Sequence, residues 1–382
     1  MLGLEKKDWD FGQRGQTPLT AADIAAVIHP DQVCLVFENG RLRPDLSVGD
    51  LPAGVSIKSL ATALKEDSGR LQQRLSAAAD LNPNVFVDLS RIHLSGGVVI
   101  EVAAKTKVSP ELHFIDVQSV DNIACNQRNI MLVGELAEVT VLQSSLTLDG
   151  IKPGFRNLVQ QFSVGAGSQL RHYRQQQEQP GSYLVDQTWY ELQRDARLDQ
   201  FTFTAGAGTV RNNLDIKISG SNAEAHFNGL YLAGKGLHVD NHSSVEHAVP
   251  HSRSDQVYKG ILVEDGRAVF NGKVLIREGA VGTDAGQLNK NLLLSNDAEI
   301  DTKPELQIDA DDVKCAHGAA IGQLNQDELF YLQTRGIPKA AAEAILARGF
   351  LDELLEPLAS SAFRASCGQS VDMFLQQQDG SR

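Results

Sequence analysis

A thiol and an imidazole stand two residues apart in Cys315-Ala316-His317. Residues i and i+2 of a β-strand lie on one face, roughly 6–7 Å apart, so both side chains could reach a common ion. Thiolate and imidazole suit iron, zinc or an iron–sulfur cluster. Zinc takes four ligands and a cluster takes about four cysteines or their substitutes, so a partner chain would have to complete such a site. The alternative is a chance pair without chemistry.

A second candidate site comes from histidines that crowd into one part of the chain. Five of the ten fall between residues 226 and 251, namely His226, His238, His242, His247 and His251. On a strand, His238, Asp240 and His242 would share one face and could hold zinc or iron(II). The alternative is a polar sheet face whose histidines bond to their neighbours. The sequence leaves both interpretations open.

The Gly-rich segment Gly229–Gly236 is similar to a phosphate-binding loop but lacks two of its parts. Gly236 follows Lys235 at the position where the loop needs a hydroxyl for magnesium. The residues after it predict a strand, so the helix N-terminus that would bind the phosphate is missing. We therefore expect that this chain does not hydrolyse nucleotides.

These candidates lie in a long stretch of short β-rich runs, from about Asn84 to about Asp312. Gly, Asn, Asp and Ser separate the runs, and helical periodicity is scarce among them. The pattern fits a sandwich, two sandwiches or a parallel β-helix, and periodicity does not choose between these. Asn271, Asn289 and Asn291 favour the solenoid, because amides inside strand-like runs can pair between stacked turns.

Residues 1–83 predict a helical region with a short strand pair. Val33–Phe37 is β-rich, and the Asn-Gly pair in Glu38-Asn39-Gly40 is a strong hairpin signal. Apolar spacing predicts helices over Ala21–Ile28, Ile57–Glu66 and Leu71–Leu81.

Residues 322–382 predict a second helical region at the C-terminus. Capping residues and glycines divide it into three expected helices, over 325–336, 338–349 and 350–357. Residues 84–321 between the two helical regions then form the β-rich core.

The composition excludes several classes of protein. With 35 Lys and Arg against 48 Asp and Glu, the net charge of −13 argues against binding to nucleic acid or to an anionic membrane. The four cysteines form no Cys-x-x-Cys and suit a reducing compartment. No stretch has the length and apolarity of a signal peptide or a transmembrane helix. We expect a cytoplasmic protein.

Longer strings around these residues resemble a known family. The stretch His238–Gly336 contains HVDNHSSVEHAVPHSRSDQVYKGILVEDGRAVFNGK, QLNKNLLLS, TKPELQIDADDVKCAHGAAIGQL and ELFYLQTRGI. These strings resemble the SufB/SufD family of iron–sulfur cluster assembly scaffolds, and a weaker likeness, including RNNLDIKISG and FENGRL, extends over most of the chain. The chain is most similar to the SufD type. Gly318 follows His317 where the SufB type has glutamate, and the N-terminal cysteine cluster of many SufB-type members is missing.

The resemblance implies a right-handed parallel β-helix over residues 84–321, flanked by N-terminal and C-terminal α-helical regions. It implies pairing with a SufB-type subunit through the β-helices. Residues 322–382 would be the dock for a SufC-type ATPase. The anchors of that dock would be Phe330, Tyr331, Ile337 and Phe350, unless they pack within their own domain. Whether the isolated chain forms a homodimer stays open.

In such a scaffold His317 and Cys315 would face the β-helix interface as ligands of iron or of the nascent iron–sulfur cluster. The cluster would be transient and shared with the partner. The chain itself would be no enzyme, since ATP hydrolysis belongs to the ATPase subunit. Reduced FAD accompanies such complexes, although no flavin motif is legible here.

Two rival functions remain. One is a metal-dependent enzyme that uses His238, Asp240 and His242. The other is a carbohydrate-processing β-helix, against which stand the low aromatic content, with 2 Trp and 6 Tyr, and the lack of an evident pair of catalytic carboxylates.

Overall fold

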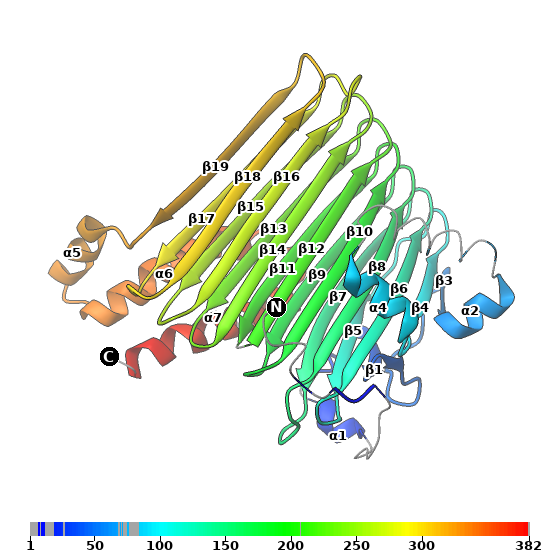
Figure 1. Ribbon diagram of the computed structural model, residues 1–382, viewed down its shortest axis with the longest axis horizontal. Coiled ribbons are helices and arrows are strands. Elements are labelled where there is room, and N and C mark those ends of the chain that lie inside the picture. The colour runs from blue at the N-terminus through cyan, green and yellow to red at the C-terminus, as the bar shows by residue number, and fades with distance from the viewer. Residues whose placement is uncertain are drawn as a thin grey trace.

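The central part of the protein is a parallel β-solenoid (Figure 1). The computed structural model describes residues 7, 9–11, 19–25, 27–67, 69, 71, 75, 84–206 and 208–380. Of the three architectures that the strand pattern allowed, the parallel β-helix is confirmed. Its strands are β4 (Val98–Val102), β5 (Glu111–Gln118), β6 (Ala124–Val133), β7 (Glu138–Thr147), β8 (Phe155–Val164), β9 (Gln169–Glu178), β10 (Tyr183–Leu192), β11 (Arg197–Gly206), β12 (Gly208–Ile218), β13 (Glu224–Ala233), β14 (Leu237–His247), β15 (Arg253–Leu262), β16 (Arg267–Ile276), β17 (Asp284–Leu293), β18 (Glu299–Ile308) and β19 (Lys314–Gly322).

Successive strands alternate between two sheets, so two strands make one turn. The even-numbered strands β4 to β18 form a nine-stranded sheet together with β3 (Val55–Ser59). The odd-numbered strands β5 to β19 form a ten-stranded sheet together with β1 (Gln32–Glu38) and β2 (Arg41–Leu42). From β4 onward, paired positions differ by 26 residues, as for Tyr183 and Thr209, to 32 residues, as for Arg267 and Glu299. Residues one turn apart in the sequence therefore lie side by side.

Alternate residues of each strand face the lumen between the sheets. In β14, for example, the residues alternate strictly between buried and half-buried. An apolar cluster fills much of the lumen and includes Phe114, Leu198, Phe227, Val245 and Ile276. Other turns of the lumen are lined by buried polar side chains such as Arg174, Gln256 and Asn289. The interior thus contains apolar and hydrogen-bonded layers.

The N-terminal region extends both sheets. The predicted strand pair is confirmed, because β1 and β2 form an antiparallel hairpin around Asn39-Gly40. β1 also pairs in parallel with β5, and β3 pairs with β4. The helix expected over Ile57–Glu66 is wrong at its start, since β3 runs to Ser59 and α2 covers Leu60–Glu66, with Ser59 as its N-cap. Residues 57–59 of the expected helix are extended instead, because β3 pairs with β4.

Two further helices belong to this region. The helix expected over Ala21–Ile28 is shorter, with α1 at Ala21–Ile24. Helix α4 (Val85–Ile92) packs on the outer face of the nine-stranded sheet near β6 and β8, and Asn84 caps it. Most of the helix expected over Leu71–Leu81 lies outside the described residues.

The C-terminal region contains α5 (Gln326–Thr334), α6 (Lys339–Leu355) and α7 (Ser361–Gly380). The helix end expected at Gly349 is wrong, because α6 continues through this glycine. Leu351 and Leu355 of α6 are buried against the ten-stranded sheet. Their burial outweighs the cost of about 1 kcal/mol for a glycine within a helix. Helix α7 was not predicted from the sequence.

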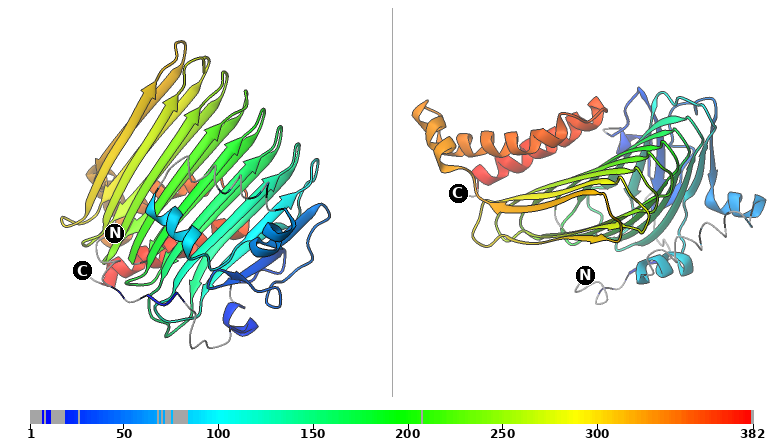
Figure 2. Two further views of the ribbon diagram at one scale, coloured as in Figure 1. Left: turned by 45° about the vertical axis from the view of Figure 1, so that its right-hand side comes forward. Right: turned by 90° about the horizontal axis from the view of Figure 1, so that it is seen from above.

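Helices α6 and α7 cover the outer face of the ten-stranded sheet (Figure 2). Leu351 of α6 and Phe363 and Val371 of α7 belong to the same apolar cluster as Tyr173 and Phe203 of the sheet. No helix in the described part of the chain combines the length and apolarity needed to cross a membrane.

Candidate functional site

The predicted pair Cys315 and His317 lies on β19, the last strand of the ten-stranded sheet. β19 pairs with β17, and no described strand pairs with its other side. Cys315 is in register with the buried Ala285, and His317 is in register with the buried Gln287. The two residues therefore stand on the lumen side of the strand, at the open end of the solenoid.

The surroundings of Cys315 and His317 differ in burial. Cys315 is half-buried and packs against the lumen cluster, as Leu306 and Val313 also do. Burial, and to a lesser extent the carboxylate of Asp284, raise the pKa of the Cys315 thiol. His317 is exposed, and among the described residues the structure gives it no hydrogen bond. Its imidazole is therefore free to take an external ligand.

The open end of the solenoid also exposes apolar side chains. Ile308 at the end of β18 is 42% exposed, and Ile321 on β19 is 50% exposed. Strand β19 has no buried residue along its length. An exposed strand edge with adjacent apolar side chains is a surface on which another sheet can add.

His238, Asp240 and His242 share one face of β14, as predicted, but it is the outer face of the nine-stranded sheet. The structure does not bring them together with His317. One carboxylate oxygen of Asp240 lies 2.8 Å from His242 Nε2, and the other is paired with the guanidinium of Arg211. Burial alone would raise the pKa of Asp240, but the interactions with His242 and Arg211 lower it. Asp240 is thus held in an ion pair.

No three side chains of His, Cys, Asp or Glu gather as a metal site among the residues that the structure describes. His247, from the same histidine-rich segment, faces the lumen and bonds to Ser252 Oγ at 2.7 Å and Ser254 Oγ at 2.9 Å. Burial lowers the pKa of His247 to about 4. This histidine is a neutral member of the core, which fits the hydrogen-bonded alternative.

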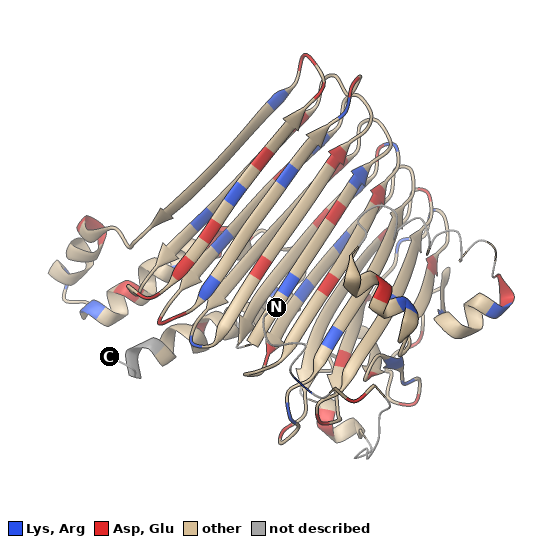
Figure 3. Cartoon of the chain, viewed as in Figure 1, with Lys and Arg blue, Asp and Glu red and all other residues tan. Residues whose placement is uncertain are grey.

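Charged side chains spread over the visible outer face of the nine-stranded sheet in both signs (Figure 3). Many pair across neighbouring strands, such as Arg277 Nε with Glu246 Oε1 at 2.7 Å. The Gly229–Gly236 segment is the end of β13 and the turn into β14, so a strand follows it, as predicted. A side chain at Gly229 would meet the Tyr258 ring at 2.2 Å, so this glycine provides space in the lumen.

The four residues predicted for the ATPase dock differ in exposure. Phe330 is 67% exposed and Tyr331 is 57% exposed, both on α5, and Ile337 is half-buried in the turn before α6. Phe350 instead packs between α6 and the sheet, with Lys259 Nζ 4.6 Å from the centre of its ring. Lys259 Nζ also donates to the Phe350 carbonyl at 2.7 Å and pairs with Glu353. Phe350 therefore fixes α6 to β15.

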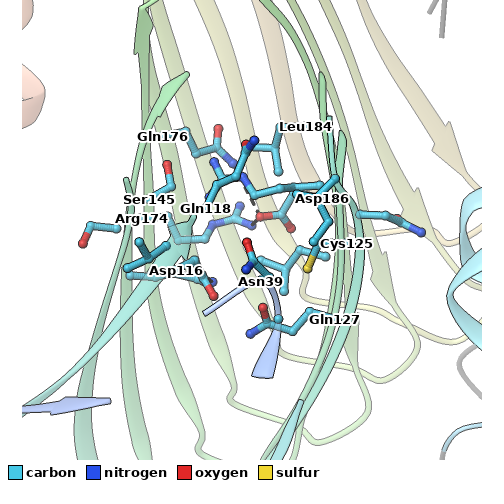
Figure 4. A pocket seen from close by; sticks show the side chains of 18 of the residues that line it. Asn39, Asp116, Gln118, Cys125, Gln127, Ser145, Arg174, Gln176, Leu184 and Asp186 are labelled. Carbon is cyan, nitrogen blue, oxygen red and sulfur yellow. Dashed lines mark hydrogen bonds and ion pairs between the residues drawn. The ribbon is translucent and has the colours of Figure 1, made fainter. Parts of the chain in front are cut away.

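Sequence reasoning missed a polar cavity in the lumen of the N-terminal turns (Figure 4). Its volume is about 40 Å³, and Asp116, Cys125, Arg156, Arg174 and Asp186 are among its lining residues. This volume holds a few water molecules and no larger ligand. These residues lie on five different strands, so only the register of the turns could have shown that they meet.

Both arginines that line this cavity are paired with a carboxylate. Arg174 Nη1 lies 2.7 Å from Asp186 Oδ2, and Arg156 is paired with Glu178. Burial and the nearby Asp116 raise the pKa of Cys125 to about 12, so its thiol is protonated at neutral pH. The cavity is therefore a buried, hydrogen-bonded part of the core.

Comparison with known proteins identifies the family. Residues 115–350 match the family model described as SUF system FeS cluster assembly, SufBD core domain. This chain belongs to the SufBD family. It is 34% identical over 371 residues to an iron–sulfur cluster assembly SufBD family protein of Synechocystis, covering 93% of this chain and 82% of that protein.

Two further relatives show which branch of the SufBD family this chain is most like. It is 30% identical over 334 residues to the iron–sulfur cluster assembly protein SufD of Escherichia coli, covering 86% of this chain and 76% of that protein. It is 24% identical over 310 residues to SufB of Bacillus subtilis, covering 81% and 67%. By this similarity the chain is SufD-like, which agrees with the resemblance seen at Cys315–Gly318.

Proposed function

We propose that this SufD-like chain is a scaffold subunit that pairs with a SufB-type subunit and a SufC-type ATPase to build and transfer iron–sulfur clusters in the cytoplasm. The observation that carries the proposal is the open solenoid end, where His317 stands without a hydrogen-bond partner in the described structure on an unpaired edge strand. Similarity to SufD and SufB of the Suf system supports the choice of partners.

In this proposal the SufB-type solenoid adds to the edge of β19 and covers Ile308 and Ile321. His317 and Cys315 then face the joint between the two lumens, where iron and sulfur are the substrates. A neutral imidazole binds iron and releases it more readily than a thiolate does. His317 is accordingly the iron ligand from this chain, and Cys315, whose thiol is half-buried and has a raised pKa, is its weaker neighbour.

The ATPase dock is α5 in this proposal, with Phe330 and Tyr331 as anchors and Ile337 at its border. Three residues, Gln323–Asn325, connect β19 to α5. Movement of a docked ATPase would therefore reach the strand that carries His317 through a short connection. The chain itself makes and breaks no bond, and reduced FAD would serve the complex as an electron source.

The alternative of a metal-dependent enzyme that uses His238, Asp240 and His242 has little support. Arg211 and His242 already contact the two carboxylate oxygens of Asp240 that would have to bind the metal. The open edge of β19 also gives the isolated chain a surface for a homodimer, which the partner would replace.

The test is co-expression of this chain with tagged SufB-type and SufC-type subunits, followed by size-exclusion chromatography. We expect all three to co-elute. Phe330→Ala and Tyr331→Ala should each weaken retention of the ATPase by about 1 kcal/mol or more while the SufB-type subunit stays bound. Glu356→Ala, an exposed change beyond the end of α6, is the control. Failure of the wild-type chains to co-elute would contradict the proposal.

A further inference from the structure

Two glutamines and His317 occupy successive stacked positions along the lumen. Gln256, Gln287 and His317 occupy paired positions on the parallel strands β15, β17 and β19. Gln256 is 1% exposed and Gln287 is 4% exposed. Paired positions of neighbouring strands lie about 4.8 Å apart, so Gln287 and His317 are neighbours on the lumen side of the sheet.

Hydrogen bonds fix the direction of both amides. Gln256 Nε2 donates to Ser243 Oγ at 2.6 Å, so its Oε1 is left as an acceptor. Gln287 Nε2 donates to that Gln256 Oε1 at 2.8 Å. The Gln287 amide therefore has one of its two N–H groups committed to the turn below, and its oxygen has no donor.

Gln287 Oε1 is buried and has no hydrogen-bond partner among the described residues. A buried acceptor without a partner costs about 1–3 kcal/mol, so such an atom indicates a missing donor. The next position in the stack is His317, whose imidazole carries an N–H and has no partner of its own in the described structure.

Gly272 on the facing strand β16 provides the space for this amide. A Cβ at Gly272 would stand 2.0 Å from Gln287 Nε2, and the backbone there does not have a positive φ. Space for the glutamine, and not backbone conformation, therefore requires glycine at this position.

We propose that Gln287 is a positioning residue for His317, whose imidazole N–H donates to Gln287 Oε1. The bond holds the neutral imidazole in one tautomer and directs the lone pair of its other nitrogen to the open end of the solenoid. Histidine ligands generally have such an acceptor on the nitrogen that does not bind the metal. The value of this arrangement for iron rests on the proposed function, whereas the hydrogen bond itself does not.

The direct test is the tautomer of His317, read from ring ¹⁵N shifts of the full chain labelled at histidine. Spectra are recorded at mildly alkaline pH. His317→Ala identifies the signals. We expect a single tautomer in the wild-type chain and a mixture in Gln287→Met, which keeps the volume but has no acceptor oxygen.

Two variants complete the test. Gln287→Glu retains an acceptor toward His317 and should restore the single tautomer. Asn289→Leu changes the next lumen amide of β17, which is in register with Ala319, and should leave the His317 signals unchanged. A mixture of tautomers in the wild-type chain, or the same tautomer in Gln287→Met, would overturn the inference, and the wild-type spectrum decides even if the variants do not fold.

Iron affinity separates this inference from the proposed function. With ferrous iron alone as the probe, the complex with the SufB-type subunit should lose about 10–100-fold in affinity with Gln287→Met. If His317→Ala leaves iron affinity unchanged while the wild-type chain shows a single tautomer, the proposed function fails and the hydrogen bond stands. If His317→Ala weakens binding and Gln287→Met does not, the positioning role fails.

Discussion

Cys125 and Cys315 both face the lumen, but one lies in its N-terminal turns and the other at its open end. Cys125 lines a buried cavity whose arginines are paired with carboxylates, and burial raises its pKa to about 12. Cys315 is half-buried on an edge strand, beside an exposed histidine. Polar side chains that face the lumen are thus buried in the inner turns of the solenoid and exposed at its end. Polar residues in the inner turns stabilise the solenoid, and those at the open end are accessible from outside, as the proposed function requires.

The largest effect is expected in the inner turns. Arg174→Met would leave Asp186 buried without its cation, since the two side chains are 3% and 2% exposed. We expect a loss of about 3–5 kcal/mol in the free energy of unfolding, measured by urea denaturation. Arg174→Met with Asp186→Leu should recover most of this loss. A single variant as stable as the wild type would show that the pair is not needed.

Acid should also act first on the inner turns. The pKa of His247 is about 4 in the folded protein and near 6.5 when unfolded, because burial disfavours the charged ring. The unfolded state therefore binds more protons between these values, and stability falls as the pH drops from about 6.5 to 4. This histidine contributes on the order of 2–3 kcal/mol to that loss.

The measurement is the free energy of unfolding against pH. His247→Gln should have a smaller slope in this window but keep some of it, because burial also lowers the pKa of His113 to about 4. An identical slope in the variant would contradict the assignment.

Positive charges introduced at the open end should weaken binding of the SufB-type subunit without lowering the stability of the chain. The double variant Ile308→Lys and Ile321→Lys should bind the SufB-type subunit at least tenfold more weakly, or about 1.4 kcal/mol, by biolayer interferometry. The free energy of unfolding should change by no more than about 0.5 kcal/mol per site. Ile92→Lys on α4, where the side chain is 75% exposed, is the matched control. Equal loss in the control would remove the open end from the interface.

The smallest expected effect is a difference in alkylation between Cys125 and Cys315. At pH 8 the Cys125 thiol is protonated, because burial raises its pKa to about 12, and its side chain is only 4% exposed. Brief treatment of the folded chain with iodoacetamide should therefore modify Cys315 and leave Cys125 intact, as read by peptide mass spectrometry. Modification of Cys125 at the same rate would show that its cavity opens readily.

Much of the open end could be predicted from the sequence. Cys315 and His317 are two residues apart, so a strand is enough to place both on one face. The Asn39-Gly40 hairpin was legible for the same reason, since its signal is local. Helix α6 was predicted too short because Gly349 is a local signal that packing of Leu351 and Leu355 overrides.

The buried cavity could not be predicted in this way. Asp116, Cys125, Arg156, Arg174 and Asp186 span 71 positions (from 116 to 186) and have no motif in common. They meet because turns of 28 to 31 residues stack them, and that register follows from sheet pairing and not from local pattern. The sequence also did not say whether Asp240 faces the lumen or the outside of the solenoid. Polar residues at alternate positions of a strand show that they share a face, but not which face is the lumen.

The central claim is that His317 at the open end supplies a ligand for cluster assembly that no other residue of this chain replaces. It is tested by cluster reconstitution in the complex with the SufB-type and SufC-type subunits, measured as bound iron and sulfide. His317→Ala should leave complex formation and ATPase activity unchanged and reduce cluster content by about tenfold or more, while Cys315→Ser reduces it less. Full cluster content in His317→Ala would contradict the account.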